Sequence, residues 1–83
     1  MKEEIVHMTK YLEFWRVESN LTAKRYEVRG KTDRLGDQFV LGQIEYCLAW
    51  QSYVLVPTAS TQWSRSCLQD VVKFIEGVEA GRI

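Results

Sequence analysis

Few side chains in this 83-residue chain could carry acid–base or nucleophilic chemistry. There is one histidine, His7, and there are two cysteines, Cys47 and Cys67. A general base must be held within hydrogen-bond reach of its target, yet His7 falls in a short N-terminal segment, and neither cysteine has a histidine as a sequence neighbour. Asp70 lies near the start of a predicted helix, where an acidic residue more often complements the helix dipole than acts as a catalyst. We therefore predict a protein that is not an enzyme and has no catalytic residue.

Sequence motifs that bind a metal ion or a cofactor are also missing. The chain contains no CxxC, no Cys/His cluster, no glycine-rich phosphate loop and no GxSxG. Cys47 and Cys67 are predicted to be buried free thiols, because free cysteine packs as a small hydrophobic residue. A disulfide between them stays open as an alternative, if the start of the helix lies over the strand that contains Cys47. We predict no cofactor and no metal site.

Composition is that of an ordinary globular domain, with 46% hydrophobic and 27% charged residues. No apolar run approaches the roughly 18–20 residues that a transmembrane helix needs. Glu3 and Glu4 stand where a signal peptide would be basic and then apolar. The sequence therefore predicts a cytoplasmic protein that does not engage a membrane.

The alternation of apolar and polar residues predicts four strands. They are expected at residues 11–18, 24–29, 40–48 and 53–56. Pro57 ends the last strand because it has no N–H to give to a neighbouring strand. Gly42 within the third strand indicates a bulge or a close approach of backbone from another layer. Residues 1–10 are predicted to be a loose N-terminal segment, too short to hold a helix alone.

A C-terminal helix is predicted from apolar residues that recur at helical spacing between Leu68 and Val78. Ser64 or Ser66 is expected to cap its start, and Gly81 to end it. The predicted fold class is α+β: a four-stranded antiparallel β-meander followed by one C-terminal α-helix packed on one face of the sheet. Residues 11–83 would form this single β-β-β-β-α domain.

One helix covers only one face of a sheet, and the predicted strands carry apolar residues on both faces. A sheet of this composition should not leave its second face to water. The simplest covering is a partner protein or a second copy of the chain. We therefore predict self-association through the uncovered face, as a homodimer.

Aromatic residues are the other feature that suggests binding. Three tryptophans, Trp15, Trp50 and Trp63, occur in 83 residues, and Tyr53 follows Trp50 closely. Tryptophan is strongly enriched at the energetic centres of protein interfaces. The competing interpretation is that these rings close over the core. We predict these four residues as the partner-binding site of a protein-interaction module.

A basic segment supports an alternative function in nucleic-acid binding. The chain has eleven basic and eleven acidic residues, but residues 21–34 hold five basic residues against two acidic ones. The basic residues are Lys24, Arg25, Arg29, Lys31 and Arg34. Such a stretch beside aromatic rings could follow a phosphate backbone and stack bases. Glu27 stands between two of these arginines on one strand face, which favours local ion pairing instead.

From residue 41 onward the chain resembles a group of short, functionally uncharacterised proteins encoded by phages and prophages. The resemblance covers about half of the chain and rests on a Gly-Ile strand, a Trp/Tyr hairpin, a proline and a Cys-Leu helix. Its residues are Gly42, Ile44, Trp50, Tyr53, Pro57, Thr61, Trp63, Cys67, Leu68, Asp70 and Phe74. The resemblance implies the strand-then-helix order and a phage-like origin, and it implies no site. With it, the predicted function is a phage accessory protein or an inhibitor directed at a host protein.

Overall fold

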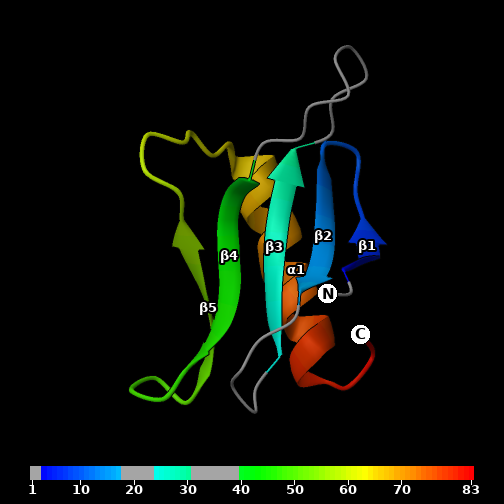
Figure 1. The fold of residues 1–83 in the computed structure, drawn as a ribbon, viewed down its shortest axis with the longest axis vertical. Coiled ribbons are helices and arrows are strands. Elements are labelled where there is room, and N and C mark those ends of the chain that lie inside the picture. The colour runs from blue at the N-terminus through cyan, green and yellow to red at the C-terminus, as the bar shows by residue number, and fades with distance from the viewer. Residues whose placement is uncertain (1–2, 18–23, 31–39) are drawn as a thin grey trace.

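A computed structural model describes residues 3–17, 24–30 and 40–83 of the chain. It contains five strands and then one helix (Figure 1): β1 (Glu4–Met8), β2 (Leu12–Val17), β3 (Arg25–Gly30), β4 (Val40–Cys47), β5 (Ser52–Pro57) and α1 (Arg65–Glu79). The strands form one antiparallel sheet in the order β1-β2-β3-β4-β5. The predicted α+β class, with an antiparallel sheet and a C-terminal helix, is confirmed.

The prediction of four strands was wrong, because the described part of the chain has five. Residues predicted as a loose segment, 1–10, contain β1, which pairs with β2 through Ile5 opposite Trp15 and His7 opposite Phe14. The register shifts between Ile5 and His7. The intervening residue, Val6, packs against the core. A bulged edge strand of this kind has neither strict alternation nor helical spacing, so its pattern in the sequence is ambiguous.

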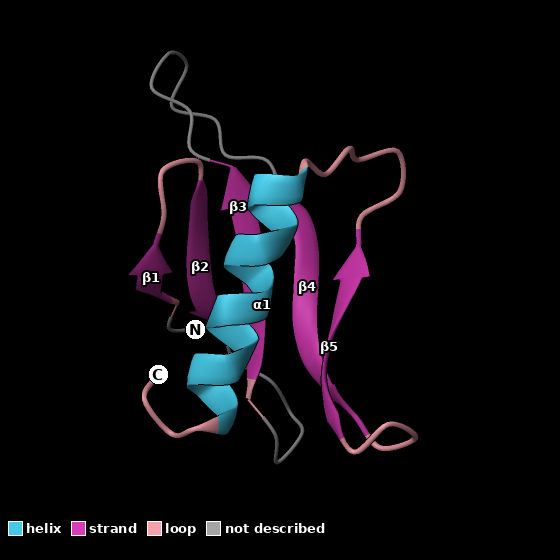
Figure 2. Cartoon of the chain, turned by 180° about the vertical axis from the view of Figure 1, so that it is seen from behind, coloured by secondary structure: helices cyan, strands magenta, loops and turns pink. Residues whose placement is uncertain are grey.

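The helix lies across one face of the sheet (Figure 2), and the core fills the space between them. The rings of Phe14 and Phe74 stack with centroids 4.3 Å apart, and Tyr26 meets Phe74 edge-on at 5.1 Å. The fully or almost fully buried residues of this core are Leu12, Phe14, Tyr26, Val28, Ile44, Val71 and Phe74. Apolar side chains from three strands and the helix therefore hold the two layers together.

Gly42 lies where the neighbouring strand β5 and the Trp63 side chain both approach β4 closely. A Cβ atom at this position would lie 3.0 Å from the carbonyl oxygen of Val56 and 3.2 Å from the ring of Trp63. The register between β3 and β4 also shifts beside it, between Val28 and Arg29. The predicted bulge therefore occurs beside Gly42. The close neighbour from outside the sheet is the Trp63 side chain rather than backbone, since the Val56 carbonyl belongs to the adjacent strand β5.

Both ends of α1 are closed by local hydrogen bonds. The Ser64 side chain accepts a bond from the Cys67 N–H at 3.1 Å, which makes Ser64 the N-cap. At the other end Gly81 has φ +76, and the N–H groups of Gly81 and Arg82 bond back to Val78 and Gly77. This is a Schellman motif, which satisfies carbonyls at the C-terminus of a helix. Gly81 therefore ends the helix as predicted.

Candidate functional site

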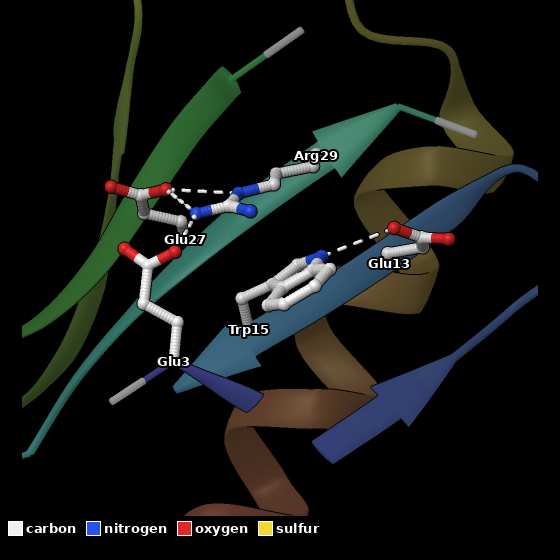
Figure 3. Close-up of polar contacts among 5 residues, drawn as sticks. All are labelled: Glu3, Glu13, Trp15, Glu27 and Arg29. Carbon is white, nitrogen blue, oxygen red and sulfur yellow. Dashed lines mark hydrogen bonds and ion pairs between the residues drawn. The ribbon is translucent and has the colours of Figure 1, made fainter. Parts of the chain in front are cut away.

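The sheet face opposite α1, hereafter the open face, carries a compact group of polar contacts around Trp15 (Figure 3). The guanidinium of Arg29 lies 4.3 Å from the centroid of the Trp15 ring. The Trp15 Nε1–H donates a hydrogen bond of 3.1 Å to the carboxylate of Glu13. A guanidinium this close to an indole is a cation–π pair, so it both fixes and partly covers the ring.

Two carboxylates hold Arg29 in that position. Its Nε and Nη2 donate to Glu27 Oε1 at 3.0 and 2.7 Å, and Nη2 also donates to Glu3 Oε1 at 3.0 Å. Burial lowers the pKa of Arg29, but the hydrogen bonds and charges of Glu27 and Glu3 outweigh it, so the net shift of the pKa is upward. Glu3 lies 26 residues from Arg29 and precedes β1, so the group ties the N-terminal strand to the middle of the sheet.

We call these residues the Arg29–Trp15 cluster: Glu3, Glu13, Trp15, Glu27 and Arg29 (Figure 3). The centre of the open face is thus occupied by charged groups that bind one another. Apolar side chains of this face lie around that centre: Ile5 and Met8 on β1, Val17 on β2, Val40 on β4, and Val54 and Val56 on β5. The apolar surface expected on this face is therefore interrupted by the Arg29–Trp15 cluster.

The β4–β5 turn projects the most exposed large apolar side chains of the described residues. We call residues 48–51 the hairpin tip. Leu48 is 83% exposed and Trp50 is 77% exposed. The Gln51 N–H donates to the Leu48 carbonyl at 3.3 Å, and Gln51 has φ 53. The tip is a four-residue loop, and Gln51 takes the positive φ because the loop contains no glycine or asparagine.

The four residues predicted to bind a partner do not share one surface. Trp15 lies on the open face and Trp50 at the hairpin tip. Tyr53 and Trp63 lie on the helix side of the sheet, where both pack against the core. The Tyr53 ring meets Tyr46 edge-on at 5.5 Å. Of the four, only Trp50 is exposed.

Two exposed apolar residues of the β4–β5 hairpin were not predicted as site residues. Leu48 had been assigned to the end of a strand, whereas it begins the turn. Val56 lies on the open face and is exposed. By residue type, leucine and valine are both expected in the core. For Leu48 the sequence indicates exposure only through its position in the turn. For Val56 it does so only through the alternation of side chains along a strand, which directs Val56 to the face opposite Leu55.

The residues predicted to bind nucleic acid are only partly described, because Lys31 and Arg34 lie outside the described ranges. Lys24 is exposed just before β3, and Arg25 and Arg29 point to the open face. Arg29 is already held by carboxylates. The charged residues described on this face are the acids Glu3, Glu13, Glu27 and Glu45 and the bases Arg25 and Arg29. The acids described on this face thus outnumber the bases, and the alternative of nucleic-acid binding stays a prediction.

The potentially reactive side chains lie apart from one another. His7 on β1 lies near the rings of Phe14 and Phe74, at 5.7 and 6.0 Å. Cys47 points to the open face, whereas Cys67 packs against the core from α1. Both thiols are free and half-buried. Because the sheet separates them, the alternative of a disulfide between them is wrong for this fold.

Neither a metal-binding group nor a membrane-spanning helix occurs in the described part of the chain. Residues 3–17, 24–30 and 40–83 hold no group of three or more His, Cys, Asp and Glu side chains that could bind a metal ion. The single helix found there is also neither long nor apolar enough to cross a membrane.

Comparisons with protein-family models, with curated proteins and with solved structures found no match to this chain. The resemblance to phage-encoded proteins is therefore still a prediction.

Proposed function

We propose that this chain is a small non-enzymatic protein-binding module whose contact surface is the hairpin tip together with the β5 side of the open face. The observation that carries the proposal is the exposure of Trp50, at 77%, in a turn closed by a backbone hydrogen bond. A tryptophan side chain can remove roughly 150–250 Å² from water when it is covered by a partner. Its position at a hairpin tip makes that area accessible to another protein.

Neighbouring residues extend this surface. Leu48 shares the tip with Trp50, and the side chains of Val54 and Val56 continue along the open face from β5. A central aromatic anchor surrounded by smaller apolar contacts is the usual arrangement of an interface hot spot. Because the turn is already ordered, little conformational entropy is lost when a partner binds it.

A different protein fits this surface better than a second copy. Face-to-face association of two copies would bring together two open faces on which the described acids outnumber the bases, and like charges repel across an interface. The resemblance to phage-encoded proteins makes a host protein the first class of partner to test.

The experiment is capture of a partner by the chain from a lysate of the cells in which it is made, with Trp50→Ala as the test variant. Trp50→Ala should retain the unfolding free energy within about 0.5 kcal/mol, because the side chain is exposed, and should lose at least about tenfold in affinity. Tyr11→Ala is the matched control, since Tyr11 is also exposed, at 51%, but lies beside β1. Equal capture by all three proteins would refute the proposed surface.

A further inference from the structure

The two edges of the sheet differ in how they are protected from pairing with another strand. At one edge, β1 has only five residues, a register shift between Ile5 and His7, and an ion pair from Glu4 to Arg16 on β2. Short length, bulges and charges are the usual devices that prevent edge-to-edge association. At the other edge, β5 has the sequence SYVLVP and carries no charged residue.

The outward backbone groups of β5 can be identified from the hydrogen bonds at its two ends. The Thr58 N–H bonds to the Leu41 carbonyl of β4 at 2.9 Å, whereas the Tyr53 N–H bonds to the Glu79 side chain at 3.4 Å. Since successive N–H groups alternate sides along a strand, Tyr53, Leu55 and Pro57 direct their backbone groups away from β4. Leu55 is the central residue of the three, and Pro57 has a carbonyl but no N–H.

One side of α1 lies next to this edge. Leu68, Val72, Ile75 and Glu79 are spaced by four, three and four residues, so they follow one side of the helix. Glu79 reaches the backbone of β5, which shows that this side faces the β5 edge. Val72 is 55% exposed and Leu68 is 44% exposed. We call Leu68, Val72 and Ile75 the α1 flank.

We propose that a second copy of this chain pairs with β5 in antiparallel orientation, about a two-fold axis at Leu55. In this register the two Leu55 residues exchange both backbone hydrogen bonds. Each Tyr53 N–H leaves the Glu79 side chain, to which it donates at 3.4 Å, and donates to the other copy's Pro57 carbonyl instead, which frees the Glu79 carboxylate. Pro57 has no N–H for the opposite Tyr53 carbonyl, so each end of the pairing makes one backbone hydrogen bond in place of two and the pairing stops there. Two five-stranded sheets would become one continuous sheet.

Side chains and charges favour a second copy as the occupant. Tyr53 and Leu55 point to the helix side of the sheet, so those of the second copy would lie over the α1 flank of the first. The two-fold axis also makes the two helices antiparallel. Arg65 at the start of each helix then faces the end that carries Glu76 and Glu79 of the other. This surface is complementary to itself, as a two-fold interface requires.

This inference goes beyond the proposed function, because it uses the β5 edge and leaves both hairpin tips free. The test is sedimentation velocity of the whole chain between roughly 5 and 500 µM, a range chosen for an interface at the small end of the known sizes. The parent chain should shift from monomer to dimer with concentration. Trp50→Ala should leave that shift unchanged, so the two proposals can fail separately.

Charge variants locate the interface. Val72→Arg should weaken dimerisation at least about tenfold, whereas Met8→Arg, at a similarly exposed position on the β1 edge, should not. Arg65→Glu should weaken the dimer by placing acid against acid. Adding Glu76→Arg to Arg65→Glu should restore it to within about threefold of the parent, which also shows that the variants fold.

Three results would overturn the inference. One is a parent chain that stays monomeric over the whole concentration range. This result would overturn the inference even if an extended peptide from another protein were found to bind the β5 edge. Another is equal weakening by Met8→Arg and Val72→Arg. The third is failure of the double charge exchange to restore the dimer while its circular dichroism matches the parent.

Discussion

On the open face, β2 and β3 carry the Arg29–Trp15 cluster, whereas β4 and β5 carry Val54 and Val56 and end in the hairpin tip. In the first half, Trp15 is covered by Arg29 and its N–H is bonded to Glu13. In the second half, Trp50 is exposed to solvent. The two tryptophans therefore differ in environment, since one is held by contacts within the sheet and the other is exposed. The difference shows that tryptophan content alone does not identify a binding site.

Edge protection follows the same division. The Arg29–Trp15 cluster and the Glu4–Arg16 ion pair stabilise the β1 side of the sheet. The β5 side has an uncharged edge strand and an exposed α1 flank. From this difference between the two sides, we expect substitutions on the β1–β3 side to change the unfolding free energy. Substitutions at the hairpin tip and the β5 edge should change binding to another chain.

The largest expected effect is on the core that both halves share. Phe74→Ala removes the ring that stacks on Phe14 and should lower the unfolding free energy by about 3–5 kcal/mol. That is a large part of the roughly 4–12 kcal/mol expected for a chain of this length. Urea denaturation measures the loss. Val72→Ala, on the same helix but exposed, is the control and should change the value by less than about 1 kcal/mol.

A smaller loss is expected at the contact between β4 and the segment before α1. Gly42→Ala places a Cβ atom 3.0 Å from the Val56 carbonyl and 3.2 Å from the Trp63 ring, so these groups must move apart. We expect a loss of about 1–3 kcal/mol in unfolding free energy. Gly30→Ala is the control, because its nearest contact is an ordinary 3.7 Å from the Leu41 side chain. Equal losses at the two positions would show that Trp63 does not pack closely over Gly42.

The Arg29–Trp15 cluster predicts unequal costs for two arginines. The side chains of Arg29 and Glu27 are 13% and 15% exposed, whereas those of Arg16 and Glu4 are 45% and 55% exposed. Arg29→Met should cost about 1–3 kcal/mol, since it leaves half-buried carboxylates without their donor. Arg16→Met should cost less than about 1 kcal/mol, because surface ion pairs contribute little. Chemical denaturation measures the unfolding free energy of both variants. Equal losses would show that the Arg29–Trp15 cluster stabilises the fold no more than the surface ion pair of Arg16 with Glu4 does.

A feature of this fold could be predicted from the sequence when it depends on residues close together in the chain. It could not when it depends on pairing between distant segments. The helix and strands β2 to β5 were predictable because their apolar periodicity is local. Strand β1 was not, because Ile5 and Met8 also fit a helical spacing and only pairing with β2 decides between the two. Gly42 signalled a close approach, but nothing local identified Trp63 as the neighbour.

The candidate site was less predictable than the fold. Trp50 was named among four aromatic residues, but its exposure depends on the direction in which the turn projects. The ion pair of Arg29 with Glu3 joins residues 26 positions apart, so charge counting assigned Arg29 to a basic segment instead. Pairings of this kind depend on strand order, which composition does not reveal.

The smallest predicted effect is a pH dependence at Tyr26, where the two halves meet. Burial raises the pKa of Tyr26, Tyr53 raises it further, and Arg16 opposes the shift. The folded state therefore keeps the phenol proton at a pH where the unfolded chain, with a tyrosine pKa of about 10, has lost it. The stability contributed by this group is fully present below about pH 10 and is lost as the pH rises further.

Tyr26→Phe isolates this contribution from those of the other tyrosines. The unfolding free energy of the parent chain should fall more steeply above about pH 10 than that of the variant. Equilibrium denaturation at a series of pH values measures both curves. Parallel curves would mean that burial does not raise the pKa of Tyr26.

The most direct test of the central claim, that recognition belongs to the β4–β5 half, is photo-crosslinking in the cells that make the chain. A photoreactive phenylalanine analogue would replace Trp50 in one protein and Tyr11 in another, both exposed positions but in opposite halves. We predict a discrete crosslinked protein from position 50 and none from position 11. The same crosslinked protein from both positions, or one from position 11 alone, would contradict the account.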